Sequence, residues 1–242
     1  MTGLARVWIV PVDLPPEAAD RCGDALDDSE RARAAAFLSQ RDRQRYTVAH
    51  GALRILAARE LRVTPSALRW DHGPYGKPAL AAPWSGLSTS LSHSADLVAV
   101  AVAEGRAVGV DIQHLVPGLD VVAMSARFYP PAEAAYVAAG RDAGAREDRF
   151  TRLWSRKEAV VKAAGGRLWP NLGVAVLGRD VLGRDAVGCD LVGCDEPPGA
   201  HRVADVTAPA GFWAAVALAG AAPFATQAVT WPAEVAAPAV AG

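Results

Sequence analysis

The sequence predicts an α+β protein in which two similar α/β halves follow one another. Short apolar segments with strand character alternate with stretches of helical periodicity along the 242 residues. Residues 45–47 (Arg-Tyr-Thr) and 149–151 (Arg-Phe-Thr) each open a helical stretch, nine residues before Arg54 and Glu158 respectively. This repetition indicates related halves. Because 51% of the residues are hydrophobic and 21% are charged, the chain can bury a core.

The first half, residues 1–104, begins with a strand that ends at two prolines and continues through a helix-rich stretch that Pro65 stops. Its expected elements, in order, are a strand at residues 7–12, helices within 29–61, a turn-rich strand and loop at 70–78, and an apolar strand at 97–103.

The second half, residues 105–232, should open with a turn at 104–106 that makes residues 108–113 the hairpin partner of the preceding strand. Helices follow at about 120–128 and 148–164, the second stopped by Gly165 and Gly166. Further strands are expected at 174–177, 201–206 and 213–218, and a flexible tail at 233–242. Residues 178–197 carry an imperfect five-residue repeat, which we interpret as an expanded hairpin or loop.

Composition excludes several function classes. A formal net charge of −1 and a pI near 6.5 argue against nucleic-acid binding, which needs a basic surface. No signal peptide is evident at the start, and the longest apolar run, residues 212–222, is too short to span a membrane. Three cysteines, Cys22, Cys189 and Cys194, favour a reducing cytoplasm over a disulfide framework and lack zinc-site companions.

A first candidate site lies on the strand Gly-Val-Asp-Ile-Gln at residues 109–113. Because side chains alternate between the two faces of a strand, Gly109, Asp111 and Gln113 should share a face opposite the buried valines and isoleucine. A carboxylate and an amide oxygen on one face could form half of a magnesium site. A strand with a solvated polar face would show the same pattern.

A second candidate lies on the helix that contains Trp154, Lys157, Glu158 and Lys162. Glu158 and Lys162 are four residues apart and therefore share a helix face, with Trp154 one turn earlier. An ordinary surface Glu–Lys pair is the alternative interpretation.

A third group of cations in the first half could hold a phosphate: Arg54, Lys77 and His93. Lys77 lies in a Tyr-Gly-Lys-Pro turn with Pro78, and His93 follows Ser92 just before an apolar strand. Each of these residues could equally be structural or simply exposed.

The order of these segments, YGKP, SHS, GVDIQ and WSRKEAVVK, resembles the Sfp-type 4'-phosphopantetheinyl transferases. The family patterns are a GxDxE strand and a WxxKExxxK helix, and the second is intact here as Trp154, Lys157, Glu158 and Lys162. The resemblance covers residues 45–170 well. It implies the pseudo-dimeric fold of that family in a monomer, and magnesium-dependent (or manganese-dependent) transfer of phosphopantetheine from coenzyme A to an apo acyl or peptidyl carrier protein.

The resemblance also implies a set of site residues. Metal ligands would be Asp111, Glu158 and Gln113, the last standing where the family has glutamate. Glu158 would act as general base, Lys162 would stabilise the leaving phosphate, and Asp111 would take part in catalysis by holding the metal against the pyrophosphate. Coenzyme A would contact Arg54, Lys77, Pro78, Ser92, His93, Lys157 and Lys162, with Arg54 and His93 on its 3'-phosphate.

Two other functions stay open at this point. The chain could be a coenzyme A or carrier-protein binding module that lost transfer with the change to Gln113. It could also be another metal-dependent phosphotransferase or hydrolase, although it lacks the Gly-rich phosphate loop of nucleotide triphosphatases.

Overall fold

The computed structural model describes residues 3–73, 76–115, 118–178, 190–195 and 198–231. The first half contains β1 (Gly3–Pro11), α1 (Pro16–Ala25), α2 (Asp28–Ala35), α3 (Gln40–Leu61), the short 3-10 helix η1 (Pro65–Ala67), β2 (Trp70–His72), β3 (Pro78–Leu80), β4 (Leu87–Ser94) and β5 (Leu97–Glu104). The second half contains β6 (Val108–His114), α4 (Val121–Phe128), α5 (Pro131–Ala138), α6 (Ala143–Ala164), α7 (Leu168–Asn171), β7 (Asp190–Asp195), β8 (Pro198–Val206), β9 (Phe212–Ala219) and β10 (Phe224–Thr230).

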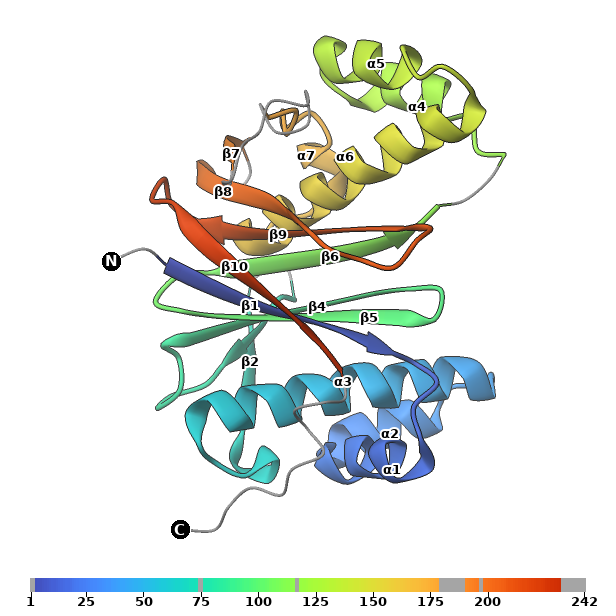
Figure 1. The fold of residues 1–242 in the computed structure, drawn as a ribbon. Helices are drawn as coiled ribbons and strands as arrows, with labels where there is room; N and C mark the ends of the chain where they lie inside the picture. Colours follow the sequence, from blue (N-terminus) through green and yellow to red (C-terminus); the bar gives the residue numbers. More distant parts are fainter. Residues whose placement is uncertain (1–2, 74–75, 116–117, 179–189, 196–197, 232–242) are drawn as a thin grey trace.

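The predicted α+β class is confirmed, and the strand order repeats between the halves. One four-stranded sheet has the order β10-β1-β5-β4 and the other has the order β6-β9-β8-β7. The series β1-β5-β4 and β6-β9-β8 are both antiparallel, and in each the first strand precedes a 22-residue helix, α3 or α6. Figure 1 shows the two sheets at the centre, with α1 to α3 on one side and α4 to α7 on the other.

Three local expectations differ from the structure. Residues 97–103 and 108–113 are not hairpin partners, because β5 pairs with β1 and β4 while β6 pairs with β9 in the other sheet. Residues 174–177 are not a strand. Instead, the amides of Val176 and Leu177 donate to the Glu133 carboxylate. Finally, β10 pairs in parallel with β1, so the end of the second half completes the first sheet.

The two long helices have local signals at both ends. The Ser39 hydroxyl accepts from Asp42 N at the start of α3, and the Asp142 carboxylate accepts from Ala145 N at the start of α6. The latter cap starts α6 at Ala143, earlier than the expected position near Asp148. Gly165 ends α6 as predicted, in a left-handed conformation with φ of 73°. Residues 233–242 and most of the 178–197 repeat lie outside the described residues.

The two sheets meet where β4 of the first half lies beside β6 of the second. Serine hydroxyls of β4 accept hydrogen bonds from backbone amides of β6 at 2.9–3.0 Å. The pairs are Ser88 with Val108, Ser90 with Val110, and Ser94 with His114. Each pair is separated by the same 20 positions, so β4 and β6 run in the same direction at this junction. The junction therefore places residues of both halves side by side.

Candidate active site

The strand β6 and the helix α6 approach each other most closely at Gly109. A Cβ atom at this position would lie 2.0 Å from the carbonyl oxygen of Ala159 and 2.3 Å from the amide nitrogen of Ala163. Only glycine permits this contact. The expected alternation along β6 is also present, because Val108, Val110 and Ile112 pack into a core on the opposite face. The acidic face of β6 is thus directed at α6.

Two carboxylates from these two elements meet at one ammonium group. Lys162 Nζ lies 2.6 Å from Asp111 Oδ1 and 3.4 Å from Glu158 Oε2. Ser92 of β4 donates to the same Asp111 oxygen at 2.6 Å and accepts from Lys162 at 2.9 Å. Trp154 Nε1 donates to Glu158 Oε1 at 2.7 Å. Residues from β4, β6 and α6 therefore converge as the sequence predicted.

Burial governs the charge of Asp111. Its side chain is fully buried, and burial raises its pKa to about 7; the ammonium of Lys162 opposes this rise and the Glu158 carboxylate adds to it. Gln113 donates its amide to Asp111 Oδ2 at 3.0 Å, so in this state it supports the carboxylate through its nitrogen. A buried carboxylate that is paired with a second one needs a cation, and Lys162 supplies it here.

The same donor set fits a divalent cation in its chemistry. In the described parts of the chain, no group of three His, Cys, Asp or Glu side chains is arranged for a metal ion. The cluster offers two carboxylates and one amide, all oxygen donors of the kind that magnesium prefers. Magnesium commonly completes such a set with waters and substrate phosphates, so two carboxylates are sufficient protein ligands.

A pocket of about 110 Å³ lies between α3 and β4, and we call it the cationic pocket after Arg45, His50 and His93 in its lining. Phe37, Tyr46 and Ala49 also line it, as does the Asp42 carboxylate, which pairs with Arg45 at 3.0 Å. Partial burial lowers the pKa of His93, and so do the positive charges of Arg45, Lys162 and His50. Because Lys162 acts on His93, the pocket and the carboxylate cluster are electrostatic neighbours. Such a pocket suits a phosphate group.

The structure separates Arg54 from this pocket, contrary to the sequence expectation. Its side chain is 1% exposed and forms ion pairs with Asp27 and Glu30, and it donates to the carbonyl of Pro65 at 3.1 Å. Arg54 therefore holds α2 and η1 against α3. It acts on the pocket only indirectly, because Glu30 also lies 3.5 Å from the His50 ring nitrogen.

Arg45 takes the place in the pocket that we expected for Arg54. Its Nε atom donates to the carbonyl of Ala95 at 3.2 Å, and its Nη1 atom donates to Asp42 at 3.0 Å. The sequence held a signal for it, since Arg45 opens the repeated Arg-Tyr-Thr segment, but residue type alone did not distinguish it from other arginines.

Lys157 also lies away from the cluster. Its ammonium is fully buried, 2.6 Å from the Glu133 carboxylate and 4.5 Å from the centre of the Tyr129 ring, and it donates to the carbonyl of Val174. Burial lowers its pKa and Glu133 opposes this. The expectation that Lys157 adds a cation toward coenzyme A is not supported by this position. Lys157 instead anchors the segment around Val174 beneath α6.

Lys77 and Pro78 lie at the end of the loop that enters β3. Pro78 is exposed, whereas Lys77 Nζ donates to the carbonyls of Val108 at 2.9 Å and Ala163 at 3.3 Å. Lys77 therefore contacts the second half of the chain, and the structure does not direct it into the cationic pocket.

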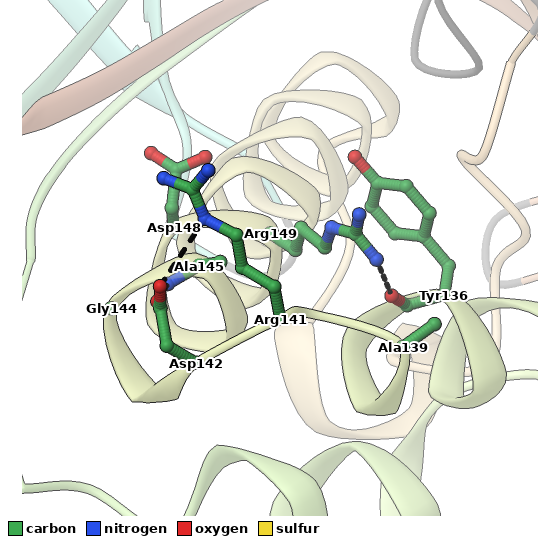
Figure 2. Close-up of a pocket in the computed structure, with 8 residues that line it drawn as sticks. All are labelled: Tyr136, Ala139, Arg141, Asp142, Gly144, Ala145, Asp148 and Arg149. Atoms are coloured by element: carbon green, nitrogen blue, oxygen red, sulfur yellow. Dashed lines mark hydrogen bonds and ion pairs between the residues drawn. The ribbon is translucent and has the colours of Figure 1, made fainter.

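Two further hollows border α6. One, of about 260 Å³, begins at Glu158 and Gln113, and its lining combines polar residues with apolar side chains such as Val121, Met124 and Phe150. The other, of about 660 Å³, lies at the start of α6, where Arg149 donates to the carbonyl of Tyr136 at 2.7 Å (Figure 2). None of the predicted site residues lines the hollow in Figure 2, which is at the opposite end of α6 from Lys162.

Within the described residues, no helix is both long enough and apolar enough to cross a bilayer. A family model described as the 4'-phosphopantetheinyl transferase superfamily matches residues 107–198, which include all of β6 and α6. The chain is 34% identical over 162 residues to the 4'-phosphopantetheinyl transferase HetI of Nostoc sp., covering 66% of this chain and 68% of HetI. It is 28% identical over 162 residues to a 4'-phosphopantetheinyl transferase of Bacillus subtilis, covering 66% of this chain and 70% of the relative.

Proposed function

Because this chain belongs to the 4'-phosphopantetheinyl transferase superfamily and is a transferase, we propose that it moves the 4'-phosphopantetheine of coenzyme A onto a serine of an apo acyl or peptidyl carrier protein, with 3',5'-ADP as the second product. One observation carries the proposal. Asp111 of β6 and Glu158 of α6 meet at the Lys162 ammonium, whose charge acts on His93 in the cationic pocket.

The cationic pocket accounts for recognition of coenzyme A. We assign Arg45, His50 and His93 to the 3'-phosphate, since three groups that can carry positive charge line one small pocket. With the 3'-phosphate there, we propose that the pyrophosphate lies near Lys162, whose charge acts on His93 and which contacts Ser92 of β4. The reacting phosphorus would then lie near the carboxylate cluster.

The cluster fits magnesium, with manganese as a possible substitute. Asp111 and Glu158 would hold the ion, and Gln113 would contribute its amide oxygen after rotation of the side chain. When bound, the ion neutralises pyrophosphate charge and makes the phosphorus a better electrophile. Gln113 brings no charge, so the affinity for the ion should be lower than with a third carboxylate.

The chain's own residues then position and protonate the reactants. The carrier serine oxygen bonds to the pantetheine-side phosphorus while the bond from that phosphorus to the oxygen of 3',5'-ADP breaks. Glu158 accepts the hydroxyl proton, directly or through a water, and the Trp154 indole holds the carboxylate in place at 2.7 Å. Lys162 stabilises the negative charge that develops on the leaving phosphate.

One chain contains both sides of this site. The phosphate pocket and Ser92 come from the first half, while Asp111, Glu158 and Lys162 come from the second. The repeated strand order supplies these two halves in a single polypeptide. We therefore propose that the enzyme acts as a monomer, and that it works in the cytoplasm, as the odd number of cysteines favours.

The proposal is tested by the intact mass of an apo carrier protein after incubation with this enzyme, coenzyme A and magnesium. We expect the carrier to gain one phosphopantetheine arm. The gain should disappear with EDTA or with the isosteric substitution Asp111→Asn. An unchanged carrier mass with every carrier type tested, while coenzyme A still binds, would instead identify a binding module.

A further inference from the structure

The relative position of β6 and α6 decides whether the proposed transfer site forms. Asp111 lies two residues beyond Gly109 on β6, whereas Glu158 and Lys162 lie on the turns of α6 that Gly109 touches. The contact at Gly109 is backbone against backbone, so it excludes side chains but contributes no directional bond between strand and helix. The Asp111–Lys162 ion pair joins β6 to α6, but both of its members belong to the proposed site. A bond from outside the site would hold the crossing whatever these two side chains bind.

Lys77 supplies such bonds from a third segment. Its Nζ atom donates to the carbonyl of Val108, the residue before Gly109, at 2.9 Å. It also donates to the carbonyl of Ala163, the residue after Lys162, at 3.3 Å. Ala163 lies in the last turn of α6, where carbonyls have no partner further along the helix and the helix dipole favours a cation. One ammonium group thus bonds both sides of the crossing.

The surroundings of Lys77 support a fixed role. Its aliphatic part lies against Gly165, where a Cβ atom would be 3.7 Å from Lys77 Cδ. Lys77 is half-buried, and this burial lowers its pKa to about 8. Both described hydrogen bonds of its ammonium are directed at β6 and α6, so in this structure the group is engaged with the protein.

The geometry points to Lys77 as a positioning residue of the proposed transfer reaction: it clamps β6 to the end of α6 and so holds Asp111 in register with Glu158 and Lys162. This inference rests on the proposed function and deepens it. Lys77 does not contact substrate in this account, and its effect on the reaction passes through the clamp.

The test compares Lys77→Met, which keeps an unbranched side chain as far as Cε but has no donor, with Lys77→Arg, which keeps the charge and the donors. Binding of 3',5'-ADP is measured by calorimetry, and kcat and KM are measured with coenzyme A and an apo carrier protein. Hydrogen exchange of residues 108–114 and 159–163 reports on the clamp without any turnover. Thermal unfolding confirms that each variant is folded, and Lys77→Gln replaces Lys77→Met if the latter does not fold.

We expect Lys77→Met to lower kcat by roughly ten-fold or more, because displacements of about 1 Å are enough to cost that much. The affinity for 3',5'-ADP should stay within about two-fold, exchange at both segments should become faster, and Lys77→Arg should recover most of kcat. In a Lys162→Ala background, Lys77→Met should lower kcat by a smaller factor than in the wild-type protein, because both substitutions disturb the same arrangement of β6 and α6 residues.

A loss of 3',5'-ADP affinity that matches the loss in kcat/KM, with kcat unchanged, would overturn the clamp and make Lys77 a phosphate ligand. Unchanged exchange at both segments would also overturn it. Absence of any transfer by the wild-type protein would refute the proposed function instead, and the exchange experiment would still decide whether Lys77 clamps β6 to α6.

Discussion

Substitution of Gly109 by alanine should separate the two elements that carry the carboxylates. The added Cβ atom would lie 2.0 Å from the Ala159 carbonyl oxygen, whereas ordinary contacts begin at 3.4 Å, so strand and helix must move apart by about 1 Å or more. Overpacking of this kind costs about 1–3 kcal/mol in the free energy of unfolding. A displacement of about 1 Å at reacting groups can lower turnover about 100-fold. We therefore expect Gly109→Ala to fold with reduced stability and to be nearly inactive.

A matched control exists in the other half. Gly51 of α3 lies equally close to backbone, because a Cβ atom there would be 2.3 Å from the carbonyl oxygen of Cys22 in α1. Gly51→Ala should destabilise the protein by a similar amount in urea unfolding, but the folded fraction should keep most of its kcat. Turnover of Gly109→Ala at the level of Gly51→Ala would refute the argument that the β6–α6 approach sets the geometry of the site.

Four further substitutions separate recognition, folding and metal binding. Arg45→Ala should raise the dissociation constant for 3',5'-ADP with little change in melting temperature. Arg54→Ala should instead destabilise the protein by about 1–3 kcal/mol, because it removes the buried partner of Glu30 and of the half-exposed Asp27. Calorimetry and thermal melts of both variants check this. The affinity for 3',5'-ADP should increase as the pH falls, because the pKa of His93 is lowered in the free protein and a bound phosphate raises it, so binding takes up a proton between the two values. His93→Gln should remove this pH dependence of 3',5'-ADP affinity. If the affinity of the variant still changes with pH in the same way, another group takes up the proton. Gln113→Glu should lower the magnesium concentration needed for half-maximal turnover, and it should lower the melting temperature in EDTA because a third carboxylate then joins Asp111 and Glu158. An unchanged magnesium titration would place Gln113 outside the metal site.

Local periodicity in the sequence was enough to predict the faces of β6 and α6. Alternation along residues 109–113 placed Asp111 and Gln113 together, and the four-residue spacing placed Glu158 beside Lys162. The pairing of strands was harder, because the turn at 104–106 suggests a hairpin. In the structure this turn instead connects two sheets, and β6 finds its partner in β9, about a hundred residues later. Such non-local pairing has no signal in a short window.

The roles of the cations depended on distant partners. Arg54 and Lys157 have the residue types that bind phosphate, but Asp27 and Glu30 pair with the first and Glu133 pairs with the second. These partners come from other helices, so spacing along the chain does not reveal them. Likewise, the apolar segment at 174–177 looks like a strand, although the Glu133 carboxylate satisfies two of its amides. Buried charge pairs thus explain why Arg54 and Lys157 lie away from the carboxylate cluster.

The central claim is that the cluster of Asp111, Glu158 and Lys162 transfers phosphopantetheine rather than binding or hydrolysing coenzyme A. The most direct measurement follows released 3',5'-ADP and modified carrier protein in the same reaction, with coenzyme A and magnesium. The account predicts that the two products appear in equal amounts and that both vanish with Lys162→Ala or when the carrier's acceptor serine is replaced by alanine. Release of 3',5'-ADP without modified carrier would mean hydrolysis, and the absence of both products would mean that the cluster only binds.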